Sequence, residues 1–510
     1  MLYPLSYGGQ TGVHCSTFCN RCRADAPRLP RMTHMHVAGS IHADAVTPAP
    51  KWLHYPEDVN ALVQRLWSTT VRRDDDGVMQ VGGVPLPQIA EEVGTPAFVI
   101  DEVDFRQRMT AWRDAFAATG TEPGMTVYYA GKSFLCGTVV DWVATDGLNL
   151  DVCSHEELQL ALAAGFDASR IGLHGNNKSE AELETAVTAG VGRIVVDSVM
   201  EIERLDRIAR AHGRQAPVLV RVTAGVEAHT HEYISTAHED QKFGLGIESG
   251  AASDALVRCE DASGIELRGI HSHIGSQIFD TSAFEVSTRR TLRLAAEVAE
   301  RIGRLLPELD LGGGFGIAYT TVDAPMEPAD IAGRLRAIVV HECRALDLAV
   351  PDLSIEPGRA ISGPAGLSLY TVGTVKPVLL GEGMYRLYIS VDGGMSDNIR
   401  PALYGADYSG TIANRASGAE PTLGRVVGRH CESGDILIRD EFFPRDVAPS
   451  DLVAIPGTGA YSREMASNYN HVTRPPVVAV RDGRIRTLIR RETLDDLFAL
   501  DPVLVERRKC

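Results

Sequence analysis

The sequence predicts an α/β chain with a closed (β/α)8 TIM-like barrel and a second, antiparallel β-sandwich or β-barrel domain. Strand-like segments alternate with helical patterns eight times between about residues 127 and 355. Such alternation is typical of a parallel sheet, and eight units favour a closed barrel over an open sheet. After about residue 366, apolar segments are separated by Gly, Pro and Asp turns, a pattern typical of antiparallel strands.

The first hundred residues are less regular. Residues 1–34 are predicted to form a disordered leader, because they are rich in Arg, Pro and Cys without a periodic apolar pattern. Cys15, Cys19 and Cys22 have the C-x3-C-x2-C spacing of a radical iron–sulfur enzyme. That cluster loop should follow a barrel strand and none precedes it, so we interpret these cysteines as incidental. Within residues 35–100 we expect an amphipathic helix over 56–76, and strand-like pieces over 81–100 that partly join the β domain.

The predicted barrel covers residues 101–365 and the predicted β domain covers residues 366–510. The barrel strands are expected at 127–130, 148–151, 170–174, 193–197, 218–222, 267–273, 309–311 and 353–355. The longest helix is expected at about 284–305. The β-domain strands are expected at 370–378, 385–391, 423–427, 452–455, 477–480 and 485–489.

Composition limits the classes of protein that this chain can be. It has 510 residues and a formal charge of −17, with no basic stripe, so we expect neither nucleic-acid nor anionic-membrane binding. No apolar run reaches about 18 residues, so we expect no membrane span. The nine cysteines are mostly scattered among apolar residues, as in reduced, cytoplasmic proteins.

Polar residues that follow the barrel strands are candidate site residues, because the carboxyl ends of all eight strands meet at one mouth. Lys132 follows the first strand in Ala130-Gly131-Lys132-Ser133. An amine there can form a Schiff base with an aldehyde cofactor if its pKa is lowered. An isolated lysine is more often a solvated surface residue, so this interpretation depends on partners at the other strand ends.

An H-x-H pattern, His271 and His273, lies on the sixth strand and places both rings on one side. A metal pair is the alternative, but in barrel hydrolases such pairs normally lie on the first strand. We therefore expect no metal, with one ring inside the packing and His273, nearer the mouth, stacked on a ligand. His229, His231 and His238 share one loop and are expected to be ordinary loop residues.

The last two strands end in turns that suit a cofactor with a phosphate tail. The glycine run 312–316 lets backbone N–H groups approach a phosphate, and no Lys-Ser/Thr pair follows it, which disfavours a nucleotide P-loop. Glu356-Pro357-Gly358-Arg359 follows the eighth strand. Its carboxylate can keep a pyridine nitrogen protonated and its guanidinium can bind an anion, with a structural salt bridge as the alternative.

Further candidates lie in the predicted β domain. Cys431 stands beside Glu432 in a turn, and a thiol there can donate a proton, although a packed cysteine is the commoner case. Arg400 and Tyr404 lie together in one segment, and Tyr461 ends the segment Gly457-Thr458-Gly459-Ala460-Tyr461.

Taken in this order and spacing, the motifs resemble the diaminopimelate decarboxylases, a family of fold-type III enzymes that use pyridoxal 5′-phosphate. The resemblance covers about residues 40–500. It rests on 129–132, 271–277, 312–316, 356–359, 431–435 and 459–461.

The resemblance implies a role for each candidate. Lys132 would carry the cofactor, His273 would stack on its ring, and Glu356 would meet the pyridine nitrogen. Ring and phosphate would be held by Ser276, Gly314, Pro357, Gly358 and Arg359. Substrate would be bound by Arg359, Arg400, Tyr404, Glu432 and Tyr461, of which Tyr461 would also reach the cofactor. Cys431 would donate a proton in the partner subunit's site, so a homodimer with shared active sites is expected.

The implied reaction is decarboxylation of meso-2,6-diaminopimelate to L-lysine and CO2, the last step of lysine biosynthesis. Arg359 and Arg400 would hold the distal carboxylate and Glu432 the ammonium group. The alternatives are decarboxylases of ornithine, arginine or carboxynorspermidine, an alanine racemase, and a non-catalytic regulator that keeps the barrel. This chain departs from common family residues at Ser133, often alanine, and at Thr223-Ala224, often Asn-Pro.

Overall fold

The computed structural model describes residues 49–120, 122–226, 242–381 and 384–508. The predicted leader, the three cysteines near the N-terminus and the three-histidine loop therefore lie outside the described residues. None of the described helices is long and apolar enough to cross a membrane.

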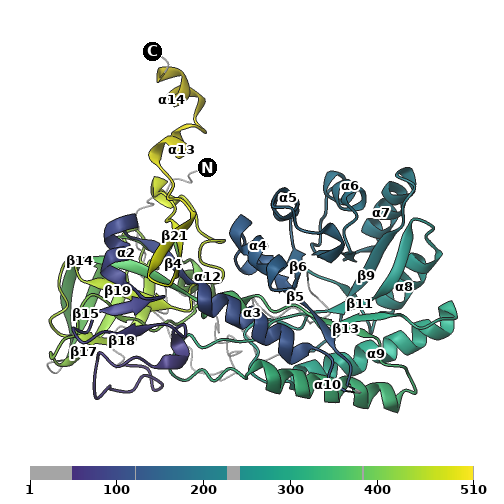
Figure 1. The fold of residues 1–510 in the computed structure, drawn as a ribbon, viewed down its shortest axis with the longest axis horizontal. Coiled ribbons are helices and arrows are strands. Elements are labelled where there is room, and N and C mark those ends of the chain that lie inside the picture. The colour runs from purple at the N-terminus through teal and green to yellow at the C-terminus, as the bar shows by residue number, and fades with distance from the viewer. Residues whose placement is uncertain (1–48, 121, 227–241, 382–383, 509–510) are drawn as a thin grey trace, which may run out of the picture.

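Eight parallel strands close into a barrel, as predicted, with helices around its outside (Figure 1). Each strand pairs with the next along the chain, and the last pairs with the first. The strands are β5 (Met125–Ala130), β6 (Asn149–Val152), β7 (Ile171–Leu173), β8 (Arg193–Val196), β9 (Ala216–Thr223), β11 (Ile265–Ser272), β12 (Glu308–Asp310) and β13 (Asp352–Ile355). A short β10 (Leu245–Gly246) adds to the edge of β9.

Serine caps begin three successive barrel helices. The Oγ atoms of Ser154, Ser179 and Ser198 each accept a backbone N–H in the first turn of a helix, α5 (His155–Ala163), α6 (Glu180–Ala189) and α7 (Val199–Ala211), which satisfies a donor that the helix leaves free. The barrel helices are α3 (Glu102–Phe116), α4 (Gly137–Thr145), α5 (His155–Ala163), α6 (Glu180–Ala189), α7 (Val199–Ala211), α8 (Ala251–Asp261), α9 (Ser282–Ile302), α10 (Pro328–Ala345) and α11 (Arg359–Ser362).

The second domain is a mixed β-sheet rather than a purely antiparallel one. Two of its pairs are parallel, β15 with β17 and β4 with β20, because long connections separate the paired strands in the sequence. Its strands are β4 (Ala97–Asp101), β14 (Gly366–Gly381), β15 (Met384–Val391), β16 (Thr411–Ile412), β17 (Pro421–Val427), β18 (Ile436–Pro444), β19 (Leu452–Pro456), β20 (Val477–Arg481) and β21 (Arg484–Ile489). Its helices are α12 (Arg400–Tyr404), α13 (Leu494–Phe498) and α14 (Pro502–Arg507).

The N-terminal part of the described chain packs on this sheet. Its elements are η1 (Gln64–Leu66), β1 (Arg72–Arg73), β2 (Met79–Val81), β3 (Val84–Pro85) and α2 (Leu86–Val93). Strand β4 pairs with both β14 and β20. The exact domain boundaries at residues 35, 101 and 366 stay a prediction.

The amphipathic helix predicted over 56–76 is wrong. The structure has the single turn η1 and the short strand β1 there instead. Asn60 instead exchanges two hydrogen bonds with Ser417, and Arg73 donates to the carbonyl of Asn60. These tertiary contacts satisfy the segment's polar groups and hold it extended on the β domain, whereas a helix would leave Val63, already 37% exposed, without a core to cover.

The mouth of the barrel faces the β domain (Figure 1). The N–H of Tyr461 donates to the carbonyl of Ser133 at 2.9 Å, and the N–H of Ser409 donates to the carbonyl of Tyr319 at 3.0 Å. Loops of the β domain are therefore bonded directly to the loops that follow barrel strands.

Candidate functional site

A cavity of about 230 Å³ lies at the barrel mouth, between the two domains. Most of the residues singled out from the sequence line it together. The lining consists of Ala130, Lys132, His273, Ser276, Gly314, Phe315, Glu356, Gly358, Arg359, Arg400, Tyr404, Tyr461 and Met465. Pro357, Cys431 and Glu432 are not in this lining.

Lys132 enters the cavity from the turn η2 (Gly131–Ser133), directly after β5. Its side chain is solvent-accessible through the cavity although it stands deep among protein atoms. Loss of solvent lowers the pKa of the amine, but attraction by Cys153, Tyr461 and Glu356 outweighs this and raises the pKa above its ordinary value. In place of the lowered pKa that favours Schiff-base formation, Lys132 has a raised pKa and is a cation in this structure.

The two departures from common family residues are both accommodated by hydrogen bonds. Ser133 is fully buried, and its Oγ lies 2.8 Å from the carbonyl oxygen of Ala130 and 3.1 Å from Ser362 Oγ. Thr223 Oγ1 donates to the carbonyl of Phe243 at 2.8 Å. Neither substitution leaves an unpaired hydroxyl in the barrel.

Glu356 follows β13 and stands between two buried histidines. His174 Nε2 and His271 Nε2 each lie 3.1 Å from Glu356 Oε1. Burial alone would raise the pKa of Glu356, but the two rings lower it well below its usual range. Glu356 is therefore an anion in the wall of the cavity.

The charges behind Glu356 are held in a buried cluster. His174 Nε2 also lies 3.3 Å from Asp151 Oδ1, and Arg193 Nη2 lies 2.5 Å from Asp310 Oδ2 and 3.6 Å from Glu356 Oε1. Burial lowers the pKa of His174, but Glu356 and Asp151 raise it to about 9. Burial and Glu356 raise the pKa of Asp151 to about 6.

This cluster fits a cationic ring nitrogen in the cavity. Three carboxyl groups face two cations, Arg193 and protonated His174, so one negative charge is in excess. Glu356 lines the cavity, while its Oε1 lies 3.1 Å from each of the two imidazoles. A pyridinium in the cavity would supply the positive charge that balances the excess negative charge.

A metal site built from the same residues is disfavoured. Donor atoms of His174, His271 and Glu356 lie within 4.8 Å of one another. However, both rings approach the same carboxylate oxygen, and the guanidinium of Arg193 lies 3.6 Å from it. A cation at that point would be repelled by the arginine, so these contacts favour an ion-pair cluster.

The glycine run after β12 brings backbone to the cavity edge more closely than any side chain would allow. A Cβ on Gly313 would lie 2.2 Å from the carbonyl oxygen of Glu356, and one on Gly314 would lie 2.2 Å from that of Gly275. Gly314 also has φ +101°, which L side chains rarely adopt. Ser276 and Arg359 stand beside this run, so the backbone, a hydroxyl and a guanidinium together suit a phosphate group.

His273 lies at the carboxyl end of β11, as the sequence argument placed it. Its Nδ1 accepts a hydrogen bond from the N–H of Gly313 at 3.3 Å. Burial, Lys132 and Arg221 lower its pKa well below the ordinary value. A neutral ring at the cavity wall is suited to stacking on a planar ligand.

Cys431 and Glu432 lie in an exposed turn of the β domain. Asp435 ties the turn down, because its carboxylate accepts the N–H groups of His430 at 2.7 Å and Met395 at 2.6 Å. The turn is thus well defined, but its residues are not part of the cavity lining.

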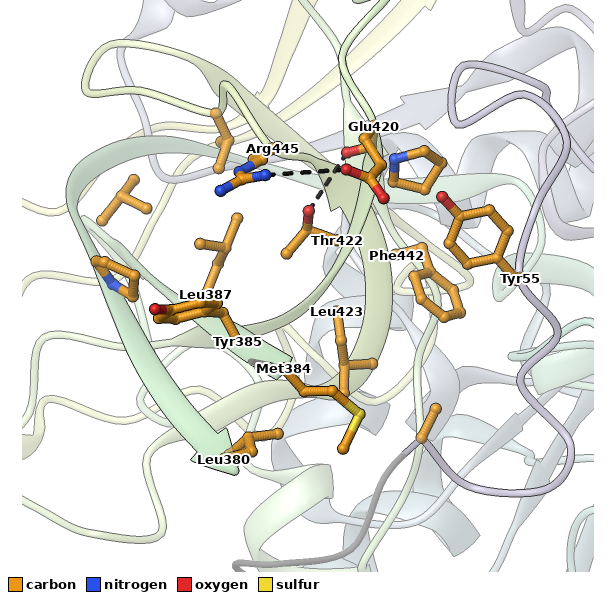
Figure 2. A pocket seen from close by; sticks show the side chains of 15 residues that line it. Tyr55, Leu380, Met384, Tyr385, Leu387, Glu420, Thr422, Leu423, Phe442 and Arg445 are labelled. Carbon is orange, nitrogen blue, oxygen red and sulfur yellow. Dashed lines mark hydrogen bonds and ion pairs between the residues drawn. The ribbon is translucent and has the colours of Figure 1, made fainter. Parts of the chain in front are cut away.

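A larger cavity of about 860 Å³ lies on the β domain and is lined mainly by apolar side chains (Figure 2). Its charged lining residues are Glu420 and Arg445, whose charged atoms lie 3.8 Å apart. It contains none of the candidate site residues and no amine or imidazole. The chemistry therefore belongs to the smaller, polar cavity.

Known proteins match this chain over most of its length. A family model described as the pyridoxal-binding domain of pyridoxal-dependent decarboxylases matches residues 102–363. The diaminopimelate decarboxylase of Mycobacterium tuberculosis is 52% identical over 444 residues, which cover 86% of this chain and 98% of the relative. The chain belongs to the diaminopimelate decarboxylase family. The family's Bacillus subtilis enzyme is 41% identical over 432 residues, covering 85% of this chain and 97% of that protein.

Solved structures in the diaminopimelate decarboxylase family have the same fold. The Helicobacter pylori enzyme complexed with L-lysine is 29% identical, with a TM-score of 0.72 over 82% of this chain and 99% of that one. The M. jannaschii enzyme, also in complex with L-lysine, is 29% identical, with a TM-score of 0.78 over 85% of this chain and 98% of that one.

Sequence reasoning missed several residues around the cavity. Asp151 and His174 end predicted barrel strands, so their position was a usable signal. Arg193 begins β8 at the other end of its strand, and no local pattern marks it. Tyr319 and Tyr408 contact the arginines of the site but stand in loops without a motif.

Proposed function

We propose that this chain decarboxylates meso-2,6-diaminopimelate to L-lysine and CO2, with pyridoxal 5′-phosphate carried by Lys132. The observation that supports it most is the set of groups in one cavity wall: an amine, a carboxylate backed by histidines, a glycine cradle and two guanidinium groups. Membership of the family adds support, because relatives 41–52% identical are named diaminopimelate decarboxylase and two solved relatives are complexed with L-lysine.

Different residues of the cavity would bind the ring and the phosphate of the cofactor. Pyridoxal phosphate, when bound, supplies an electron sink for the electron pair left when the carbon–carboxylate bond breaks. Glu356 would hold its negative charge at the ring nitrogen, and His273 would stack on the ring face. Ser276 and Gly314 would bind the phosphate end, with Pro357, Gly358 and the backbone of Arg359 shaping the turn beside it.

Substrate is held by charge at the end that does not react. Arg359 and Arg400 bind the distal carboxylate, Tyr404 and Tyr461 flank it, and Glu432 of the partner subunit, which stands beside the partner's Cys431, binds the ammonium group. Ornithine and arginine lack a distal carboxylate. They would leave two largely buried cations without an anion, which is unfavourable by several kcal/mol, about 3–5 for a broken buried pair.

Cys431 donates the proton that replaces the departing carboxylate, and it does so in the other subunit. The exposed position of its turn supports this arrangement, because the thiol cannot act in the cavity of its own chain. The active unit is therefore a homodimer with shared sites. It acts in the cytoplasm.

The test is a substrate panel with purified, pyridoxal-phosphate-loaded protein. Release of CO2 and lysine from meso-diaminopimelate, with much slower reaction of L-lysine, L-ornithine and L-arginine, is expected. Lys132→Ala should lose both the yellow cofactor band and CO2 release, whereas Lys376→Ala, on the exposed face of β14, should keep both. Activity retained by Lys132→Ala would overturn the assignment.

Shared sites predict complementation between two inactive variants. Lys132→Ala and Cys431→Ser protein, mixed under conditions that exchange subunits, should recover about a quarter of wild-type activity, because half of the dimers then contain one intact site of two. No recovery, in a mixture shown by mass spectrometry to contain hybrid dimers, would refute a site built from both chains.

A further inference from the structure

Arg359 and Arg400 are largely buried cations that have neutral partners. Their exposed fractions are 8% and 6%. Within the described residues, no carboxylate oxygen lies within ion-pair distance of either guanidinium. Arg359 Nη1 instead donates to the hydroxyl of Tyr319 at 2.5 Å and Nη2 to Ser276 Oγ at 2.8 Å, while Arg400 Nη1 donates to the hydroxyl of Tyr408.

One side chain, Tyr319, contacts both guanidinium groups. Its hydroxyl accepts a hydrogen bond from Arg359, and the guanidinium carbon of Arg400 lies over its ring, 4.6 Å from the ring centroid. Its ring also meets that of Tyr408 edge-on, with centroids 5.0 Å apart. The phenol therefore fixes one arginine by a hydrogen bond and the other by a cation–π contact.

Tyr319 is itself anchored on both sides. Its N–H donates to Asp323 Oδ2 at 2.9 Å within the barrel loop, and its carbonyl accepts the N–H of Ser409 from the β domain at 3.0 Å. Arg359 comes from the barrel and Arg400 from helix α12 of the β domain. Tyr319 thus joins, across the domain boundary, two cations that have no direct link of their own.

We propose that Tyr319 is a positioning residue that sets the spacing of the Arg359 and Arg400 guanidinium groups, so that the pair selects substrates with a carboxylate at the distal end. The proposal rests on the function proposed above, and it assigns part of the specificity for the substrate's distal carboxylate to Tyr319. Tyr408 orients only the Arg400 guanidinium, by accepting one of its N–H groups.

The choice of phenols as partners has a physical reason. A carboxylate at the same place would neutralise the arginines and compete with the substrate's own carboxylate. A phenol fixes the direction of a guanidinium by accepting one N–H, and it leaves the positive charge and the remaining N–H groups free. Both guanidinium groups can therefore still bind the carboxylate of the substrate.

The experiment compares two probes that differ only in the carboxylate. L-Lysine carries one, and cadaverine, 1,5-diaminopentane, has the same chain without it. Their inhibition constants against meso-diaminopimelate are measured on pyridoxal-phosphate-loaded wild type and Tyr319→Phe. We expect the preference for lysine over cadaverine to fall about tenfold in Tyr319→Phe, as for loss of one hydrogen bond to a charged group.

The kinetic signature separates positioning from general damage. KM for meso-diaminopimelate should rise about tenfold while kcat stays within about twofold, because the distal carboxylate does not react. The cofactor absorption band should be unchanged. Tyr388→Phe is the matched control: its hydroxyl also accepts from an arginine, Arg425, but it lies outside the cavity, and all these readouts should stay at wild-type values.

Each outcome decides the proposal. An unchanged lysine preference in Tyr319→Phe, with wild-type turnover intact, overturns the positioning role and leaves the proposed function standing. Wild-type protein that does not turn over meso-diaminopimelate refutes the proposed function instead. If Tyr319→Phe does not fold, Tyr408→Phe decides, because it removes a hydroxyl from Arg400 alone: a reduced preference supports the proposal and an unchanged one overturns it.

Discussion

His174 is the charge that allows Glu356 and Asp151 to stay ionised side by side inside the barrel. Its Nε2 lies 3.1 Å from one carboxylate and 3.3 Å from the other. Burial lowers the pKa of the ring, but the two carboxylates raise it to about 9. His174→Gln keeps a polar side chain of similar size and removes the positive charge.

The size of the effect follows from the pKa. The difference between about 9 in the folded chain and the ordinary 6.5 corresponds to about 3 kcal/mol of stability. Because the folded-state pKa is the higher one, this stability is fully present below pH 6.5 and is lost as the pH rises through 9. The substitution should therefore cost about 3 kcal/mol more at pH 6 than at pH 10.

The assay is urea unfolding of wild type and variant at pH 6, 8 and 10, followed by the fluorescence of the buried barrel tryptophans Trp112 and Trp142. The control is His212→Gln. His212 lies 2.9 Å from Glu184 on the surface, where an exposed pair is worth at most about 1 kcal/mol. A stability difference for His174→Gln that is the same at pH 6 and pH 10 would refute the reasoning.

Two further predictions concern the scaffold around the site, and thermal unfolding checks both. Gly314→Ala should destabilise the chain by at least about 2 kcal/mol, because the added Cβ would lie 2.2 Å from the Gly275 carbonyl oxygen. In the control Gly333→Ala the added Cβ meets nothing within 4 Å, so this variant should be neutral or slightly stabilised. Equal melting temperatures for the two variants would contradict this. Lys178→Met should lower the free energy of unfolding by about 3–5 kcal/mol. The buried Nζ donates to Glu201 Oε1 at 2.6 Å, and the substitution leaves that carboxylate buried without its cation. A wild-type melting temperature for the variant would show that the ion pair does not contribute to stability.

The barrel could be predicted because its signal is local. Each strand is a short apolar run followed by a polar or glycine-rich turn, and serine caps mark several helix starts. The helix predicted over 56–76 is wrong because apolar spacing alone does not specify which surface will cover the segment. Asn60 and Arg73 find partners in the β domain, more than three hundred residues along the chain, and those contacts outweigh helix propensity.

The mixed pairing of the β domain had no local signature either. Strand β4 leaves the N-terminal region to lie between β14 and β20. Strand β18 was missed, because Arg439, Asp440 and Glu441 interrupt its apolar pattern and are half-buried on the sheet.

By itself, the sequence determined which chemical groups stand at the ends of the barrel strands: an amine, a glycine run, a carboxylate and an arginine. Strand order and turn chemistry are encoded within a few residues, so local pattern is enough to find them. Only the tertiary structure decided the charge and orientation of those groups. The two histidines that keep Glu356 ionised and the tyrosine that spans Arg359 and Arg400 come from distant segments, and Coulomb and hydrogen-bond energies depend on distances that exist only once the chain has folded.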